Sequence, residues 1–236
     1  MKVTLIDFNK NAIEKLIFCK NTRLKMTASN MEEVMGMSAV EKMRTLEYIA
    51  NTIKSSWEFL DFTFMVEGVS RAFTHQFVRN RQGSYAQQTM RILNVSGFEY
   101  ITGPGVKTPE QLAAYNGAMQ DIQYQYDKLI KLGVPIEDAR GILPTNICTN
   151  IVVKYNLRTL SDMMASRASS RTQGEFRDVI DAMYEQVMKE MPWLEMFLRN
   201  KKTKAANELE SIILSDYEGT EKCMPYIKLI DIMRNN

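Results

Sequence analysis

The sequence is poor in the residue types that most often carry metal and nucleophilic chemistry. Its 236 residues contain one histidine and three widely separated cysteines, with no Cys-x-x-Cys pair. This argues against a disulfide framework and against a zinc site. Any Ser-His or Cys-His pair would have to use His75. We therefore predict no metal site, and a chemistry that depends on Arg, Asn, Gln, Ser and Tyr or on a cofactor.

An excess of one charge and long hydrophobic runs are also missing. Thirty Lys and Arg against 28 Asp and Glu give a formal net charge of +2 at pH 7. A balance so near neutral argues against a protein that binds nucleic acid through its charge alone. No stretch reaches the roughly 18 apolar residues of a membrane span, and the first residues lack the apolar core of a signal peptide. We therefore expect a cytoplasmic protein that binds neither nucleic acid nor a membrane.

The composition, at 45% hydrophobic and 25% charged residues, is typical of a globular protein with a sizeable core. Alternating apolar residues predict strands over residues 3–8, 59–70, 85–93 and 146–156. Helical spacing and capping residues predict helices over residues 12–25, 31–53, 71–79, 109–132, 135–140, 157–167 and 173–191, with Ser70 and Thr108 as N-caps of two of them. The methionine-rich stripe between residues 31 and 53 predicts core packing. With no repeat or linker, the chain is expected to form a single α+β domain over residues 1–236, in which residues 195–236 are a helical extension.

The segment from Ser70 to Arg91 is rich in arginine and has almost no carboxylate. On the predicted helix His75 and Arg79 share a face, and on the following strand Gln87, Thr89 and Arg91 point to one side. Clustered guanidinium groups repel one another by about 1 kcal/mol per close pair at a protein surface, unless an anion lies among them. A solvated basic patch is the alternative, but the alternation of Gln and Thr with Arg favours a ligand-binding face.

Two further segments have a similar composition. One carries Arg140 near a helix end, and the other carries Arg158 and Arg167 on one predicted helix. Nine residues separate Arg158 from Arg167, so they point to roughly opposite sides and suit two ligands or an interface. Each arginine alone is explained by a surface ion pair, but the three segments together favour nucleotide binding.

The segment HQFVRNRQGSYAQQTMR resembles the signature of flavin-dependent thymidylate synthases. That signature has Arg-His-Arg, seven residues, Ser, and a second Arg two positions later; the matching positions here are Arg79-Asn80-Arg81, Thr89 and Arg91. The segments VEGVSRAFTHQFVR, DARGILPTN and NLRTLSDMMASRASSRTQGEFR also resemble that family, in the right order between about Val3 and Trp193. The fold implied is a central, mostly antiparallel sheet flanked by long helices.

The sequence departs from the family pattern in four places. Asn80 replaces a His, Gln87 a Glu and Thr89 a Ser, and SSWEFLDF replaces a segment with two His while retaining Glu58. Asn80 can form hydrogen bonds but carries no charge, and Gln87 loses a carboxylate while keeping a carbonyl acceptor. These changes bear on flavin and folate binding more than on nucleotide binding.

The resemblance implies an enzyme that transfers a one-carbon unit from methylenetetrahydrofolate to C5 of dUMP, with FAD as cofactor and NADPH as reductant, giving dTMP. It implies a homotetramer with sites at subunit interfaces. Arg167 would be the catalytic residue, because it would stabilise the N3-deprotonated uracil. The residues implied for dUMP binding are Gln76, Arg79, Gln87, Thr89, Arg91, Arg140 and Arg167. Those implied for FAD binding are Ser55, Arg79, Asn80, Arg81, Gln87, Asn156 and Arg158.

Three alternatives stay open. The missing histidines could signal a variant reaction, such as hydroxymethylation or a different pyrimidine nucleotide as substrate. The chain could instead be a catalytically weakened homologue that binds flavin or nucleotide. A nucleic-acid-binding module comes last, because the net charge is close to zero.

Overall fold

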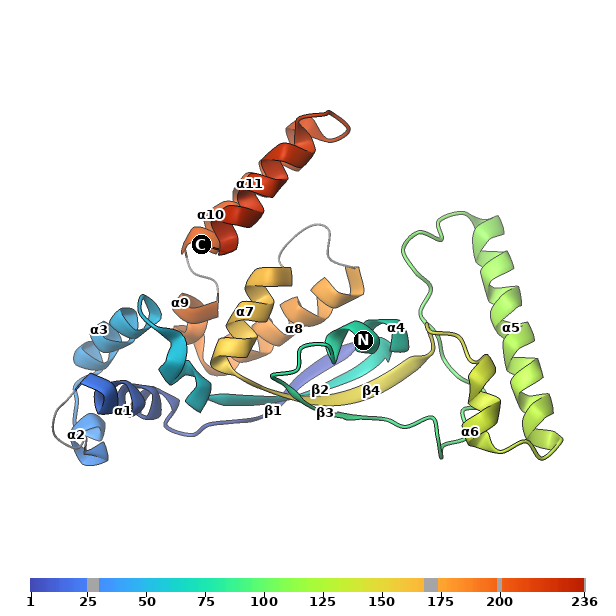
Figure 1. Ribbon diagram of the computed structural model, residues 1–236, viewed down its shortest axis with the longest axis horizontal. Helices are drawn as coiled ribbons and strands as arrows, with labels where there is room; N and C mark the ends of the chain where they lie inside the picture. Colours follow the sequence, from blue (N-terminus) through green and yellow to red (C-terminus); the bar gives the residue numbers. More distant parts are fainter. Residues whose placement is uncertain (25–29, 168–173, 199–200, 236) are drawn as a thin grey trace. The chain divides into compact units, whose positions relative to one another are not determined.

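The computed structural model describes residues 1–24, 30–167, 174–198 and 201–235, and the chain folds into two compact units. The first unit contains Met1–Val3 and Met65–Val153, and the second contains Thr4–Phe64 and Lys154–Asn236. The strands are β1 (Lys2–Phe8), β2 (Asp61–Ser70), β3 (Ser84–Gln87) and β4 (Cys148–Asn156), and they form one antiparallel sheet in the order β1-β2-β4-β3 (Figure 1). The predicted α+β class is confirmed.

Helices make up most of the remaining described chain. The first unit contains α4 (Arg71–Phe77), α5 (Pro109–Lys131), α6 (Ile136–Ala139) and the 3-10 turn η2 (Arg140–Ile142). The second unit contains α1 (Ala12–Leu24), α2 (Met31–Met35), α3 (Ala39–Ala50), η1 (Lys54–Phe59), α7 (Leu157–Arg167), α8 (Gly174–Glu190), η3 (Pro192–Leu194), α9 (Glu195–Leu198), α10 (Lys201–Tyr217) and α11 (Cys223–Asn235). None of the helices in these ranges combines the length and the apolar character needed to cross a membrane.

The sheet has the one-sided burial that its sequence predicts. In β2, Phe62, Phe64 and Val66 are buried, whereas the residues between them are partly exposed. In β4, Ile151 and Val153 are buried in the same alternating way. Side chains on a strand point alternately to opposite faces, so this pattern gives the sheet one apolar face.

Two predicted N-caps are confirmed in the first unit. The Ser70 hydroxyl accepts a hydrogen bond from the backbone N–H of Phe73, and α4 begins at Arg71. Thr108 and Gln111 form a capping box at the start of α5, where Pro109 is the first helical residue. These caps satisfy backbone N–H groups that have no partner within the helix.

The strand predicted over residues 85–93 is shorter in the structure. β3 ends at Gln87, and the Thr89 hydroxyl accepts a hydrogen bond from the backbone N–H of Arg91. This local bond offers the backbone an alternative to strand pairing. Thr89 and Arg91 therefore lie in a turn, and their predicted alternation with Gln87 on a strand face is wrong.

The helix predicted over residues 31–53 is two helices. α2 ends at Met35, and a capping box between Ser38 and Glu41 starts α3. Because the second helix starts afresh, the apolar stripe does not continue in phase, and Val40 and Met43 are exposed. The prediction that the whole stripe is core is therefore wrong, although Val34, Leu46 and Ile49 are buried.

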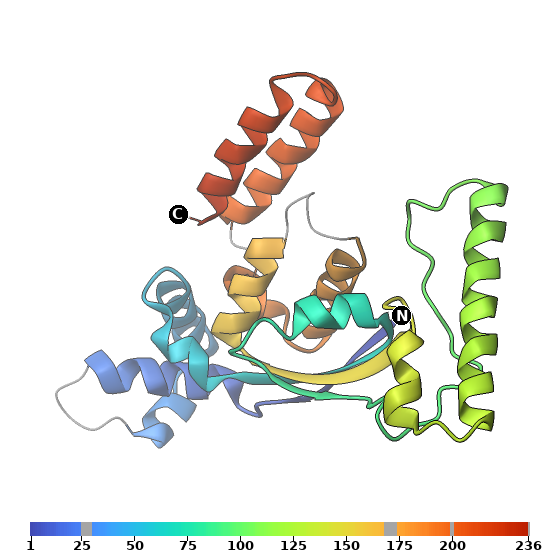
Figure 2. The same ribbon diagram turned by 45° about the vertical axis from the view of Figure 1, so that its right-hand side comes forward.

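The last two helices, α10 and α11, lie side by side (Figure 2). α10 and α11 share a small apolar core of their own, made by Ala206, Ile213, Cys223, Ile227 and Ile230. The helical character predicted for residues 195–236 is therefore present in the described part of this segment.

Candidate functional site

Each unit carries a cluster of charged side chains that includes residues singled out in the sequence. In the first unit three arginines gather around the carboxylate-bearing helix α6. Arg91 Nε donates to Glu137 Oε2 at 3.0 Å, and Arg140 Nε donates to the backbone carbonyl of Glu137 at 3.1 Å. We call Arg71, Arg91 and Arg140 the first-unit arginine cluster.

Arg71 completes this cluster and was not among the predicted nucleotide-binding residues. One of its terminal nitrogens donates to the backbone carbonyl of Gln88 at 3.1 Å. Burial lowers the pKa of the Arg71 guanidinium, and repulsion from Arg140 lowers it further. That repulsion places the Arg71 charge close to Arg140, which is far away in the sequence. The only signal for Arg71 in the sequence was its position in the segment without carboxylates.

The cluster is suited to a phosphate-bearing ligand. Among the residues that the structure describes, only Arg91 of its three guanidinium groups is paired with a carboxylate, that of Glu137, and both of these side chains are at least half exposed. Guanidinium groups bind phosphate through charge-assisted hydrogen bonds, which are stronger than neutral ones. An anion bound here would relieve the repulsion between the arginines.

The other predicted residues of the first unit lie on or just after α4. Gln87 Nε2 donates to the Thr74 hydroxyl at 2.8 Å, which ties the end of β3 to this helix. Gln76 is exposed on α4. Because α4 ends at Phe77, Arg79 lies beyond the helix. The prediction that Arg79 shares a helical face with His75 is therefore wrong.

The Arg79-Asn80-Arg81 segment forms a turn in which Asn80 has a structural part. Asn80 Oδ1 accepts a hydrogen bond from the backbone N–H of Gln82, and the Tyr85 hydroxyl donates to the Asn80 carbonyl at 2.6 Å. A histidine could not form the same Asx turn, because that turn needs a short side-chain acceptor. Arg79 and Arg81 are exposed on either side of Asn80.

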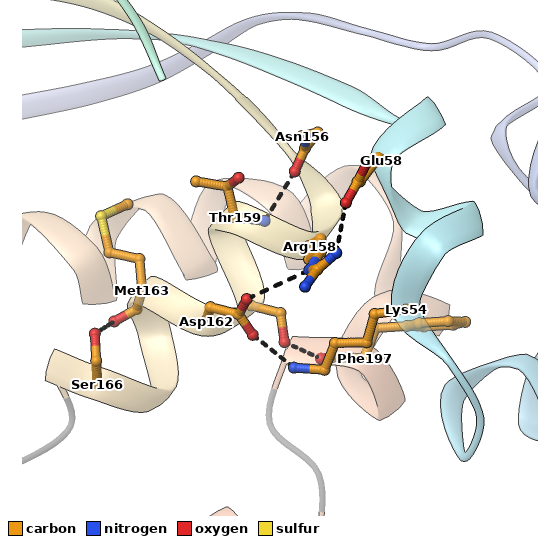
Figure 3. Close-up of polar contacts among 10 residues, drawn as sticks. Lys54, Glu58, Asn156, Arg158, Thr159, Asp162, Met163, Ser166 and Phe197 are labelled. Carbon is orange, nitrogen blue, oxygen red and sulfur yellow. Dashed lines mark hydrogen bonds and ion pairs between the residues drawn. The ribbon is translucent and has the colours of Figure 1, made fainter. Parts of the chain in front are cut away.

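The second unit contains a row of alternating charges at the start of α7, shown in Figure 3. Lys54 Nζ lies 2.6 Å from Asp162 Oδ1, Asp162 Oδ2 lies 3.9 Å from Arg158 Nε, and Arg158 reaches Glu58 Oε1 at 2.6 Å. We call these four residues the second-unit ionic chain. All four side chains are between 42% and 49% exposed, so a ligand can reach them.

The remaining predicted cofactor residues of the second unit flank this chain. Asn156 Oδ1 accepts a hydrogen bond from the backbone N–H of Thr159 at 2.8 Å, so it caps α7 and holds Arg158 in the first helical turn (Figure 3). Arg23 donates to the Ser55 hydroxyl, next to Lys54. Arg167 is the last residue of α7, and its side chain lies outside the described residues.

The donors of the second unit fit the phosphates of a dinucleotide cofactor such as FAD. They are guanidinium, ammonium and hydroxyl groups at accessible positions, which are the usual partners of phosphate oxygens. In contrast, no group of three His, Cys, Asp or Glu side chains in the described parts of the chain could hold a metal ion.

Comparison with known proteins gives a consistent result. The family described as thymidylate synthase complementing protein matches residues 4–193. A flavin-dependent thymidylate synthase of Sulfurisphaera tokodaii is 34% identical over 222 residues, which cover 85% of this chain and 83% of that protein. The Clostridium tetani protein of the same name is 31% identical over 211 residues, covering 81% and 84%. α10 and α11 follow the segment that the family matches.

Proposed function

Because the chain belongs to the family of flavin-dependent thymidylate synthases, we propose that it transfers a one-carbon unit to C5 of dUMP and reduces it to the methyl group of dTMP. Methylenetetrahydrofolate is the proposed one-carbon donor and NADPH the proposed reductant. From the family resemblance we also propose that the protein is cytoplasmic and forms a homotetramer.

The observation that carries the proposal is the first-unit arginine cluster. Arg91 and Arg140 belong to the family motifs, and both contact Glu137 in the structure. Arg71 adds a third guanidinium whose charge is close to Arg140. These three cations, of which only Arg91 pairs with the Glu137 carboxylate, are suited to the phosphate of a nucleotide, with Gln76, Gln87 and Thr89 as further polar groups.

FAD is the proposed cofactor and supplies the reducing electrons when bound. In the second unit, the Arg158 guanidinium and the Ser55 hydroxyl are proposed donors to its phosphates. The Asn156 side-chain oxygen caps α7, and its amide N–H groups are the proposed donors to the cofactor. In the first unit, Arg79 and Arg81 are exposed donors. Asn80 contributes by shaping the turn between them through its side-chain hydrogen bond.

Arg167 is the proposed catalytic residue. A guanidinium remains protonated at any working pH, so it can stabilise the anion formed when uracil loses its N3 proton. That anion makes C5 more nucleophilic. Arg167 is the last residue of α7, the helix whose first turn holds Arg158.

The test is an assay of tritium release from C5-labelled dUMP with FAD, methylenetetrahydrofolate and NADPH, followed by the mass of the product. We expect tritium release and dTMP. A hydroxymethylated product would support the variant reaction, and a protein that binds FAD but releases no tritium would be a non-catalytic homologue. A protein that takes up no FAD would contradict the proposal.

Arg167→Ala should abolish tritium release and leave FAD binding unchanged, because Arg167 is assigned to the uracil and not to the cofactor. Fluorescence titration with FAD and the tritium assay measure the two effects separately. Tritium release at the wild-type rate would remove Arg167 from the mechanism.

A further inference from the structure

Lys20 is a buried lysine without a carboxylate partner. It is 3% exposed, its Nζ donates to the Thr52 hydroxyl at 2.6 Å, and it lies 5.1 Å from the centroid of the Tyr48 ring. Within the part of the chain that the structure describes, no carboxylate forms an ion pair with it. A buried ammonium group is costly unless an opposite charge compensates it. The position therefore favours an anion nearby that is not part of the protein.

Arg23 places a second cation one helical turn after Lys20 on α1. Its guanidinium donates to the Ser55 hydroxyl, and no described carboxylate pairs with it. Ser55 directly follows Lys54, so the cations of α1 meet the second-unit ionic chain at adjacent residues. Arg23 is exposed, which leaves its remaining N–H groups open to a ligand.

Lys54 is held in place from two sides. Its Nζ contacts Asp162 at 2.6 Å and lies 5.2 Å from the centroid of the buried Trp57 ring. Asp162 also reaches Arg158, so Lys54 and Arg158 share one carboxylate (Figure 3). Two cations held by one acidic group are already positioned for an anion with several oxygens, which reduces the entropy lost on binding.

The charges around η1 leave a positive excess. The four cations are Lys20, Arg23, Lys54 and Arg158, which we call the second-unit cation cluster. The carboxylates are Glu58 and Asp162, so two positive charges are uncompensated. The pyrophosphate of a dinucleotide carries one negative charge on each phosphate and would balance them.

We propose that Arg23 and Lys54 contact the pyrophosphate of bound FAD beside Arg158, with Lys20 as a buried positioning charge one helical turn before Arg23 on α1. This inference rests on the proposed function and adds three residues to the cofactor site. The exposed cations provide hydrogen bonds to phosphate oxygens. Lys20 donates to Thr52, two residues before Lys54, and adds a buried positive charge that attracts the anion.

The test is titration of FAD into the full-length apoprotein, followed by quenching of flavin fluorescence at several NaCl concentrations. Lys54→Gln and Arg23→Gln should each weaken FAD binding by about tenfold and reduce its dependence on salt, because each removes a charge-assisted hydrogen bond. Lys54→Arg should restore most of the affinity. The matched control is Lys154→Gln, which changes another half-exposed lysine of the second unit, paired with Asp61 at 3.6 Å.

The outcomes separate this inference from the proposed function. If the wild-type protein binds FAD but Lys54→Gln and Arg23→Gln bind it equally well, the inference is wrong and the proposed function stands. If the wild-type protein binds no FAD, both the inference and the proposed function are wrong. A parallel titration with NADPH identifies the dinucleotide, and a loss confined to NADPH would overturn the assignment to FAD.

Discussion

The two charged clusters differ in how their cations are held. In the first unit, the Glu137 carboxylate pairs with Arg91, whereas Arg140 and Arg71 donate hydrogen bonds to the backbone carbonyls of Glu137 and Gln88. In the second unit, acidic and basic side chains alternate, and each cation of the ionic chain has a carboxylate partner. The repulsion between the arginines of the first cluster is therefore only partly offset by a carboxylate. In the second-unit ionic chain, the two cations and two carboxylates balance one another without a ligand.

The two clusters should therefore differ in the source of their binding energy for an anion. A bound anion in the first cluster relieves repulsion between arginines, so each guanidinium should contribute strongly to affinity. In the second unit the anion must compete with Glu58 and Asp162 for Lys54 and Arg158, so part of their charge is already compensated. Lys20 and Arg23 have no acidic partner among the described residues, so their charges are fully available to the anion.

The largest expected effect is on the first cluster. Arg91→Ala combined with Arg140→Ala should weaken dUMP binding by at least about 100-fold, because hydrogen bonds to charged groups contribute about 1.5–3 kcal/mol each. FAD affinity should stay within about twofold, since the arginines of the second unit are unchanged. Calorimetric titrations with dUMP and FAD measure both.

The control for this double variant is Arg44→Ala, which removes an exposed arginine of α3. It should leave dUMP and FAD binding unchanged. If the double variant lost FAD affinity as strongly as dUMP affinity, the two clusters would not bind separate ligands, and the comparison would fail.

The sequence predicted the parts of the molecule that follow from local patterns. The caps at Ser70 and Thr108 and the alternation in β2 depend on residues close in the chain, and all three are confirmed. The break before α3 could also have been predicted, because Ser38 and Glu41 have capping-box spacing. The end of β3 could not be predicted, because the sequence does not show whether a threonine side chain forms a hydrogen bond with the nearby backbone.

Long-range charge contacts were beyond the sequence. The Arg140 charge acts on Arg71, and Lys54 contacts Asp162, only because the fold brings distant segments together. A single lysine or aspartate in an ordinary helical segment carries no signal of its partner. The motif positions Arg91, Arg140 and Arg158 were found because they occur in recognisable segments, while the residues that hold them were not.

A second prediction concerns the cost of the buried lysine. Lys20→Met should raise the unfolding free energy of the FAD-free protein by about 1 kcal/mol, because a buried charge is replaced by an apolar chain of similar length. The same change should weaken FAD binding by about threefold, since a positive charge near the anion is lost. Urea unfolding and FAD titration measure the two effects, with Lys15→Met on the same helix as control.

The pH dependence of Lys20→Met gives a further check. Burial lowers the pKa of Lys20, and repulsion from Arg23 lowers it further. Between this lowered pKa and the ordinary value of about 10.4, the unfolded chain binds more protons than the folded chain, so wild-type stability rises with pH. The advantage of Lys20→Met should therefore be full below the lowered pKa and shrink as the pH rises from there toward about 10. An advantage that does not change with pH would mean that the charge is not its source.

The smallest expected effects come from the same chemical change made in each cluster. Glu137→Gln removes the competitor for Arg91 and leaves the backbone carbonyl that Arg140 contacts, so dUMP should bind about threefold more tightly. Asp162→Asn removes a competing charge but also the group that holds Lys54 beside Arg158, so FAD affinity should change by less than about twofold. Titration of each variant with its ligand compares them directly. If Asp162→Asn strengthened FAD binding as much as Glu137→Gln strengthens dUMP binding, Asp162 would act only as a competitor, and the second network would have no positioning role.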